Sequence, residues 1–186
     1  MFAARSAFFG VRLPADAASM VAHDRSGIEL NALLAHPRHL AELTRRVRAA
    51  YGLELPQRPR RVASGSLALL GTGPGSWLAV REAGASALLP ALRELVAGLA
   101  LVSDQSDAWG VVRLTGPRLR EALSRLVPID LDAREFACGG VANTVCAASI
   151  TLTLWRLEDV HGAPTFECAV PRSLAPSFAH ALLESA

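Results

Sequence analysis

From residue 61 to the C-terminal end, short strand-like segments and amphipathic helical segments follow one another in a regular order. Two strands, a helix, two strands, a helix, two or more strands and a final helix are predicted, with Gly- and Pro-containing turns between them. Neighbouring strands joined by short turns pair antiparallel, and the helices between them cover the sheet. The pattern therefore predicts an α+β fold with a largely antiparallel sheet. The strands are expected at residues 61–71, 77–81, 101–106, 109–114, 145–156 and 164–170, and the helices at 86–99, 117–126 and 173–185.

The first 60 residues have a weaker pattern. Residues 1–35 are irregular, and 19–34 have the character of an adaptable arm with short strands. Residues 37–51 carry apolar side chains at helical spacing, and Gly52 is a suitable C-terminal cap. The Pro- and Arg-rich run PQRPRR at 56–61 is typical of a linker. We therefore predict an N-terminal arm and helix with a linker over residues 1–60, and one α+β domain over 61–186.

The composition is sufficient for a conventional core. Of the 186 residues, 51% are hydrophobic, so the chain can bury a core without disulfides or metal. The three cysteines are widely spaced and include no Cys-x-x-Cys pair, which excludes a zinc ribbon or a redox pair of that type. Mostly small and apolar neighbours are typical of free buried thiols, and a reducing compartment is expected. These cysteines are Cys138, Cys146 and Cys168.

The charge of the chain is close to neutral, at a formal +2, and all 19 basic residues are arginine. It provides no clustered basic face, so a nucleic-acid partner is not expected. The apolar stretch at the N-terminus is short and is interrupted by Arg5 and Arg12, unlike a signal peptide. The longest apolar region, 83–102, contains Arg93 and Glu94 at its middle, which disfavours a membrane span. We expect a cytoplasmic protein without a membrane partner.

Two patterns could hold a ligand, and each has a simpler interpretation. The run GTGPG at 71–75 is a poor phosphate loop, because a strand follows it, Pro74 lacks an N–H and the chain has no lysine; a hairpin turn is favoured. His36, His39 and Glu42 are three residues apart and could share a metal. No other segment supplies a further ligand, so surface histidines at a helix start are favoured.

The sequence also offers no recognisable nucleophile. Its serines lack the Gly-x-Ser-x-Gly elbow, and its cysteines lie in no catalytic signature. No catalytic, cofactor-binding or metal-binding residue is therefore assigned.

The polar segment 103–107 is the first candidate for recognition. It separates two apolar strands, so it is in part a turn. Its carboxylates Asp104 and Asp107, with Gln105 between them, could also pair with arginines across a protein interface or hold the amine of a small molecule. We favour a turn with an interface role over a small-molecule site.

Arg172 and the tryptophans are the other candidates for recognition. Arg172 follows the strand-ending Pro171 and could hold a carboxylate of this chain or of a partner. Trp155 alternates with an aliphatic face, so its ring is expected to point away from that core and to contact a partner. Core and interface roles stay open for Trp77 and Trp109.

Four segments together resemble one known family, the gamma subunits of heterotetrameric sarcosine oxidase. The central segment is VSDQSDAW at 102–109, and a helix entry follows as LTGPRLREAL at 114–123. PIDLD at 128–132 with Phe136 and the ending FECAVPRSLAPSF at 166–178 complete the match. The resemblance extends over residues 61–186 and is loose before them.

The resemblance implies a function that no single residue indicates. The family is similar to a shortened folate-binding domain of aminomethyltransferase, which implies a duplicated α+β layout. It implies a non-catalytic subunit, without a cofactor, of a complex that oxidatively demethylates sarcosine or a related N-methyl amino acid. The implied partners are the alpha, beta and delta subunits. In them FAD belongs to beta, FMN lies between alpha and beta, NAD and tetrahydrofolate bind to alpha, and zinc binds to delta.

Two other functions stay open from the sequence. One is a stand-alone folate-binding or aminomethyltransferase-like protein, and the other is a flavin- or nucleotide-binding enzyme. Whether the chain is itself an enzyme is therefore left undecided.

Overall fold

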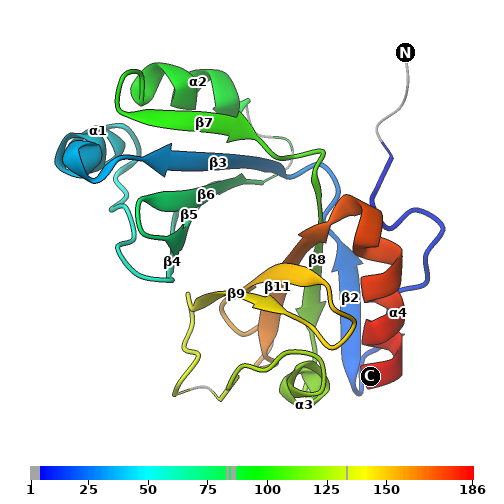
Figure 1. Cartoon of the computed structure of the whole chain (residues 1–186). Helices are drawn as coiled ribbons and strands as arrows, with labels where there is room; N and C mark the ends of the chain where they lie inside the picture. Colours follow the sequence, from blue (N-terminus) through cyan, green and yellow to red (C-terminus); the bar gives the residue numbers. More distant parts are fainter. Residues whose placement is uncertain (1–4, 83, 85–86, 133) are drawn as a thin grey trace. The chain divides into compact units, whose positions relative to one another are not determined.

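The structure, a computed structural model, describes residues 5–82, 84, 87–132 and 134–186 (Figure 1). The chain forms two compact units. One consists of Gly27–Asp107 and the other of Met1–Ser26 together with Ala108–Ala186. The first unit is therefore an insertion between two parts of the second.

The unit of residues 27–107 is built on a five-stranded antiparallel sheet with the strand order β4-β5-β6-β3-β7. Tight turns join β4 to β5 and β5 to β6, whereas β3 arrives from the start of the unit and pairs with both β6 and β7. The strands are β3 (Glu29–Ala35), β4 (Arg61–Ser64), β5 (Leu67–Gly73), β6 (Ser76–Arg81) and β7 (Ala100–Asp104).

Two helices cover one face of this sheet. Helix α1 (Leu40–Tyr51) follows a short 3-10 turn, η1 (Pro37–His39), and α2 (Leu88–Leu95) precedes β7. Gly52 ends α1 in the left-handed conformation, at φ 66°, as its cap position requires. The core between helices and sheet comprises buried side chains of α1, α2 and alternate strand positions, among them Leu43, Leu92, Leu33, Leu69 and Trp77.

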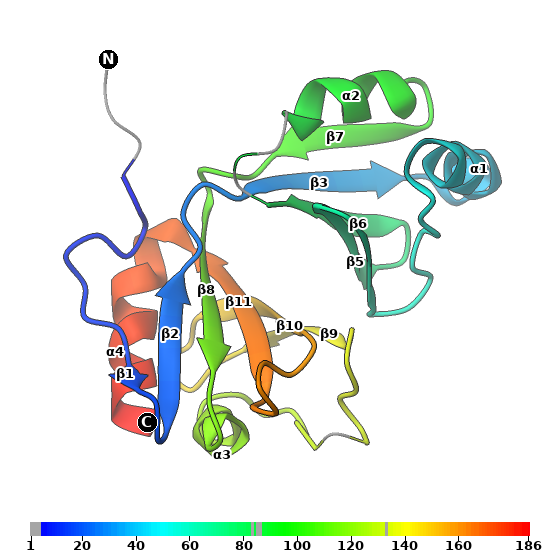
Figure 2. The ribbon, with the colours of Figure 1, turned by 180° about the vertical axis from the view of Figure 1, so that it is seen from behind.

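The second unit is built on a six-stranded antiparallel sheet with the strand order β1-β2-β8-β11-β10-β9. Helix α4 runs alongside this sheet in both views (Figures 1 and 2). The strands are β1 (Ala15–Asp16), β2 (Met20–Asp24), β8 (Trp109–Thr115), β9 (Val141–Val145), β10 (Thr151–Arg156) and β11 (Thr165–Pro171); the helices are α3 (Leu119–Ser124), η2 (Arg172–Leu174) and α4 (Ala175–Ser185).

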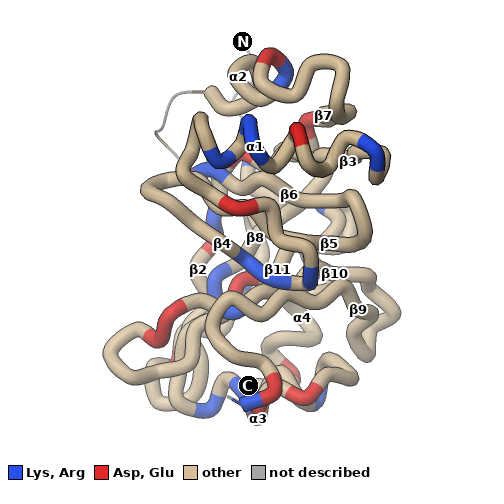
Figure 3. The backbone as a smooth tube through the Cα atoms, turned by 90° about the vertical axis from the view of Figure 1, so that its left-hand side faces the viewer, with Lys and Arg blue, Asp and Glu red and all other residues tan. Residues whose placement is uncertain are grey.

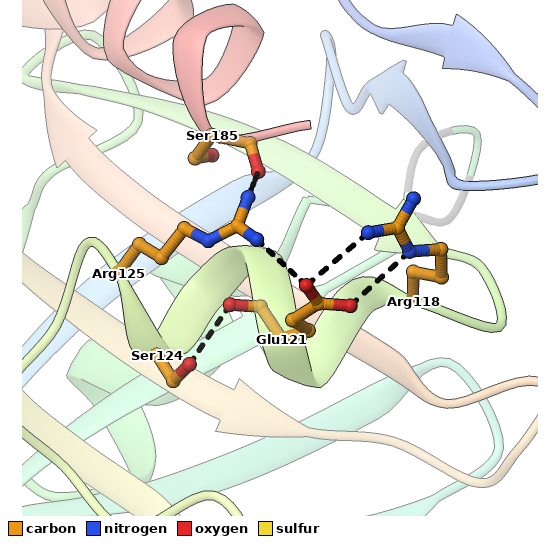
Figure 4. Close-up of polar contacts among 5 residues, drawn as sticks. All are labelled: Arg118, Glu121, Ser124, Arg125 and Ser185. Atoms are coloured by element: carbon orange, nitrogen blue, oxygen red, sulfur yellow. Dashed lines mark hydrogen bonds and ion pairs between the residues drawn. The ribbon is translucent and has the colours of Figure 1, made fainter.

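The core of the second unit lies on one face of its sheet, under α3 and α4. Leu114, Leu154 and Phe166 of the strands meet Leu123 of α3 and Phe178 of α4, all buried. A surface contact also joins the two helices: Arg125 donates hydrogen bonds to Glu121 (2.6 Å) and to the carbonyl of Ser185 (3.1 Å), as Figure 4 shows.

The α+β class and the antiparallel pairing predicted from the sequence are both confirmed. Each unit consists of an antiparallel sheet with two helices on one face, which is the repeated layout that the resemblance implies. The N-terminal region that the sequence pattern left irregular supplies strands to both sheets, β3 to the five-stranded sheet and β1 and β2 to the six-stranded one. Residues 19–34, expected as an adaptable arm with short strands, do form strands, but β2 and β3 are each paired on two sides within the sheets.

Three predicted strand arrangements need correction. Residues 61–71 form two strands, β4 and β5, with a turn at Gly65 (φ 55°). Residues 145–156 are likewise not one strand: Val145 is the last residue of β9, a turn at Ser149 (φ 59°) follows, and β10 begins at Thr151. Strands β7 and β8 belong to different sheets and do not pair. The sequence placed a domain boundary after residue 60, whereas the compact units of the structure divide at 26/27 and 107/108.

Candidate functional site

The segment 103–107 leads out of β7 and is held by its own side chains. Asp104 accepts hydrogen bonds from the backbone N–H (2.9 Å) and the hydroxyl (2.7 Å) of Ser106. Both bonds lower the pKa of the Asp104 carboxyl, and the bond from the backbone N–H is the larger cause. Gln105 donates its backbone N–H to the carbonyl of Leu30 (2.7 Å) and its amide to Ser103 (2.9 Å). The segment is therefore a structured turn that fixes the end of β7 against β3, with Asp104 and Asp107 exposed.

The predicted recognition residues fall into two groups. Asp104, Gln105 and Asp107 belong to the unit of residues 27–107, and Trp155 and Arg172 belong to the other. Arg172 is half-buried, and its guanidinium donates to the backbone carbonyl of Arg5. This bond uses one nitrogen of the guanidinium, and the role of Arg172 in holding a carboxylate stays a prediction.

Trp155 is fully buried, at 0% exposure, which corrects the expectation that its ring is available to a partner. As predicted, it lies outside the core under α3 and α4, on the other face of the sheet. Its indole N–H donates to the carboxylate of Glu167 at 2.8 Å. Trp77 is also buried and donates to the carbonyl of Pro56 (2.7 Å), whereas Trp109 is partly exposed.

Glu167 is the centre of a polar cluster that the sequence analysis missed. Its carboxylate is only 4% exposed and also accepts hydrogen bonds from the Nε atoms of Arg25 and Arg113, both at 2.9 Å. Three donors satisfy the buried charge. The sequence does contain one sign of this cluster. Each of two largely apolar strands has a single charged residue, Glu167 in β11 and Arg113 in β8.

The run at 71–75 forms the end of β5 and the hairpin turn that leads into β6, with the turn itself at residues 74–75, and two of its glycines are required by the backbone. A Cβ on Gly71 would lie 2.3 Å from the carbonyl oxygen of Arg58. Gly75 has φ 66°, and a Cβ there would lie 2.5 Å from the carbonyl oxygen of Ala35. A Cβ on Gly73 would meet only Ser76, at 3.9 Å. Close packing of the chain on itself therefore accounts for Gly71 and Gly75.

The histidines near α1 are engaged with neighbouring arginines and the helix start. His36 accepts the backbone N–H of Arg38 (3.3 Å), and His39 accepts from Nε of Arg38 (3.0 Å). Glu42 binds Arg45 (2.8 and 2.6 Å) and Arg46 (2.9 Å), and the hydrogen bond from Arg45 is the main cause that lowers the Glu42 pKa to about 2. Within the part of the chain that the structure describes, no three His, Cys, Asp or Glu side chains are grouped to hold a metal ion.

The cysteines are free thiols. Cys146 and Cys168 are buried in the core of the second unit, and burial raises the pKa of the Cys168 thiol. Cys138 departs from the expected buried environment, since it is partly exposed and donates to Glu158 at 3.0 Å.

The surface charges are mixed. Basic and acidic positions are interspersed along the chain and do not gather on one element (Figure 3). Over the described residues, no helix combines the length and the apolar character that crossing a bilayer requires.

Comparison with known proteins identifies the fold. No protein-family model and no curated protein matches the sequence. A chain of heterotetrameric sarcosine oxidase from Corynebacterium sp. U-96, solved in complex with pyrrole 2-carboxylate, has a TM-score of 0.77 at 24% identity, over 93% of this chain and 86% of that chain. Aminomethyltransferase T of the glycine cleavage system from Bartonella henselae has a TM-score of 0.63 at 19% identity, over 89% of this chain. The match covers only 46% of that protein, so this chain spans less than half its length.

Proposed function

We propose that this chain is the gamma subunit of a heterotetrameric sarcosine oxidase, or of a related complex that oxidises another N-methyl amino acid. The observation that carries the proposal is the extent of the likeness to a chain of such an enzyme, which includes 93% of one chain and 86% of the other. A likeness that includes most of both chains supports the assignment of an equivalent subunit.

The segments that resemble the family in sequence support the same subunit. The segment 102–109 lies where the chain leaves β7, turns at Ser106 and enters β8. The segment 166–178 includes most of β11, η2 and the start of α4. Both segments consist mainly of strands, turns and helix that form the two units. This agrees with a role in which the folded chain acts by binding its partner subunits.

In this proposal the chemistry takes place in the partner subunits. The beta subunit would bind FAD, FMN would lie between alpha and beta, alpha would bind NAD and tetrahydrofolate, and delta would bind zinc. The present chain would bind none of these cofactors and would stabilise the alpha, beta and delta subunits in the cytoplasm. The engagement of Gly71 and Gly75 in backbone packing supports this assignment, because the one glycine-rich run is already used by the fold.

The likeness to aminomethyltransferase favours one alternative, a stand-alone protein that binds folate or transfers an aminomethyl group. The shared fold extends over 89% of this chain, but more than half of that enzyme has no counterpart here. Titration of the isolated chain with tetrahydrofolate in a calorimeter separates the two functions. Saturable micromolar binding would favour the alternative, and a flavin absorbance spectrum of the purified chain would instead indicate a flavoprotein.

Co-expression tests the proposal directly. The chain is expressed with the alpha, beta and delta subunits encoded by the same genome, with an affinity tag on beta. We expect all four chains to elute together from a size-exclusion column, and we expect less oxidation of N-methyl amino acid when this chain is omitted. A chain that stays monomeric and leaves the activity of the other three subunits unchanged would refute the proposal.

A further inference from the structure

The two edges of the sheet in the unit of residues 27–107 differ in chemistry. The β4 edge is approached by Arg58, Pro59 and Arg60, all exposed, and Arg61 begins the strand. Charged residues and proline at a strand edge prevent another chain from pairing with it. The opposite edge, β7, has the sequence ALVSD, in which the single charged residue, Asp104, is at the last position. The β4 edge is therefore protected against strand addition, whereas β7 carries a charge only at its end and is open to pairing along residues 100–103.

The register shows which backbone groups β7 presents. Gln105 donates its N–H to the carbonyl of Leu30, and Ala35 donates to the carbonyl of Gly75 on the other side of β3. In antiparallel sheets the backbone groups of successive residues point to opposite sides of the strand. The N–H and C=O groups of residues 101 and 103 of β7 therefore point toward β3. The N–H and C=O of Val102 therefore face away from β3, on a side where the described residues contribute no further strand.

An apolar groove lies beside this edge. Leu34 of β3 and Leu101 of β7 are cross-strand neighbours and are 55% and 73% exposed. They line the groove, of about 640 Å³, together with Leu99, Gly98, Ala35, Ala100, His36, Pro37 and His39. Two adjacent exposed leucines in a hollow beside a free strand edge have the geometry of a site for an extended peptide segment with an apolar side chain.

The polar rim of the groove favours an acidic segment. His36 and His39 each accept a hydrogen bond from Arg38 on one ring nitrogen, so the other nitrogen of each ring is left to donate. Arg38 does not itself line the groove, but its guanidinium is bonded to the His39 ring that does, and no Asp or Glu is among the lining residues. A second copy of this chain would bring the same basic rim. The carboxylate at the far end of its β7, Asp104, is already bound to its own Ser106.

We propose that β7 and the groove at Leu34 and Leu101 form the docking site for an extended segment of a larger subunit. The segment adds to the sheet as a strand along β7, places an apolar side chain against the two leucines, and brings a carboxylate to the rim at His36, Arg38 and His39. The identity of the partner rests on the proposed function, since the segment would come from a subunit of the oxidase. The site itself follows from the edge, the leucines and the charge of the rim.

The test uses the complete chain and the co-expressed complex. Leu101→Arg places a charge in the groove at a highly exposed position, so the fold should tolerate it. Val145→Arg is the matched control, because Val145 is 49% exposed and lies on β9, the edge strand of the other sheet. Both variants should keep the wild-type circular dichroism and melting temperature. We expect Leu101→Arg to weaken binding to the immobilised alpha–beta–delta assembly by about tenfold or more, and Val145→Arg to bind like the wild type.

Two further measurements are specific to the proposed geometry. Hydrogen exchange of the Val102 amide should slow on assembly, because a new strand would accept its N–H. Arg38→Glu should weaken binding by about tenfold at low salt and by less at 0.5 M NaCl, because the added carboxylate repels an acidic segment through a screened interaction.

The outcomes separate the two proposals. If the wild-type chain does not assemble, the proposed function fails and the docking site fails with it. If the wild type and Leu101→Arg assemble equally well, or the Val102 amide exchanges at the same rate in the complex, the docking site alone is refuted. Sedimentation of the isolated chain as a dimer that Leu101→Arg disrupts would assign the edge to a second copy and would likewise overturn the proposal.

Discussion

At the scale of single residues, Glu167 helps to determine how three strands of the second unit pair. It is the cross-strand neighbour of both Trp155 on β10 and Arg113 on β8, and it bonds to both. A slip of β10 by one residue would move Trp155 to the opposite face of the sheet, and a slip of β8 would move Arg113, so in each case Glu167 would lose a donor. The cluster therefore selects one register for three adjacent strands, in addition to any stability that it contributes.

Removal of this charge is expected to be costly. Glu167→Gln leaves Arg25 and Arg113 without their carboxylate, and we expect the free energy of unfolding to fall by about 2–3 kcal/mol. Denaturation in urea measures the change. Glu121→Gln is the control, because Glu121 also binds two arginines, Arg118 and Arg125, but at the surface (Figure 4). Its effect should be much smaller, and equal losses in the two variants would contradict the role given to burial.

At the scale of the elements, the sequence predicted the kinds of elements better than their limits and partners. Periodicity identified α1 and its cap at Gly52, because local spacing alone determines an amphipathic helix. It did not separate β4 from β5, although Gly65 and Ser66, which form the turn between these strands, are residues typical of turns. Pairing is decided by residues far apart in the chain, so the separation of β7 from β8 into two sheets had no local signal.

The candidate site was predictable to a similar degree. The polar segment 103–107 was recognised as a turn, which the bonds of Asp104 and Gln105 confirm. The alternation of β10 gave the correct sheet face for Trp155 but not its burial, which depends on what lies over that face. The groove at Leu34 and Leu101 was not found, because exposure of a leucine in a strand depends on its neighbours in space.

Two glycines at the end of β5 provide a test at the same scale. Gly71→Ala would push a Cβ into the carbonyl oxygen of Arg58, so we expect it to lower the free energy of unfolding by about 1–3 kcal/mol. Gly73→Ala, two residues away, has room for its methyl group and should change it by less than about 0.5 kcal/mol. Thermal or urea denaturation of the two variants gives the comparison, and a destabilised Gly73→Ala beside a neutral Gly71→Ala would show that this packing is misassigned.

At the scale of the whole molecule, surface carboxylates paired with arginine occur in both units. Glu42 of α1 binds Arg45 and Arg46, and Glu121 of α3 binds Arg118 and Arg125. The bond from Arg45 lowers the Glu42 pKa to about 2 from an ordinary 4.5, and the bond from Arg118 lowers that of Glu121. The folded chain therefore binds fewer protons at these groups than the unfolded chain as acid is added.

This difference predicts the acid sensitivity of the protein. Because the folded pKa is the lower one, the contribution of Glu42 is complete above about pH 4.5 and is lost as the pH falls toward 2. The melting temperature of the wild type should therefore fall more steeply between pH 5 and pH 2 than that of Glu42→Gln. The difference should shrink in 1 M NaCl, because the pairs are exposed to solvent. Parallel pH profiles for the two proteins would show that the pair contributes nothing measurable.

The insertion of residues 27–107 between two parts of the second unit determines the order in which the two units can fold during synthesis. As the polypeptide emerges from the ribosome, β2 appears early, but its neighbour β8 is made only after the whole inserted unit. The inserted unit has all its own strands within one continuous stretch and can fold first. Strand β2 must therefore wait for β8, and during that interval its apolar side chains remain accessible to chaperones.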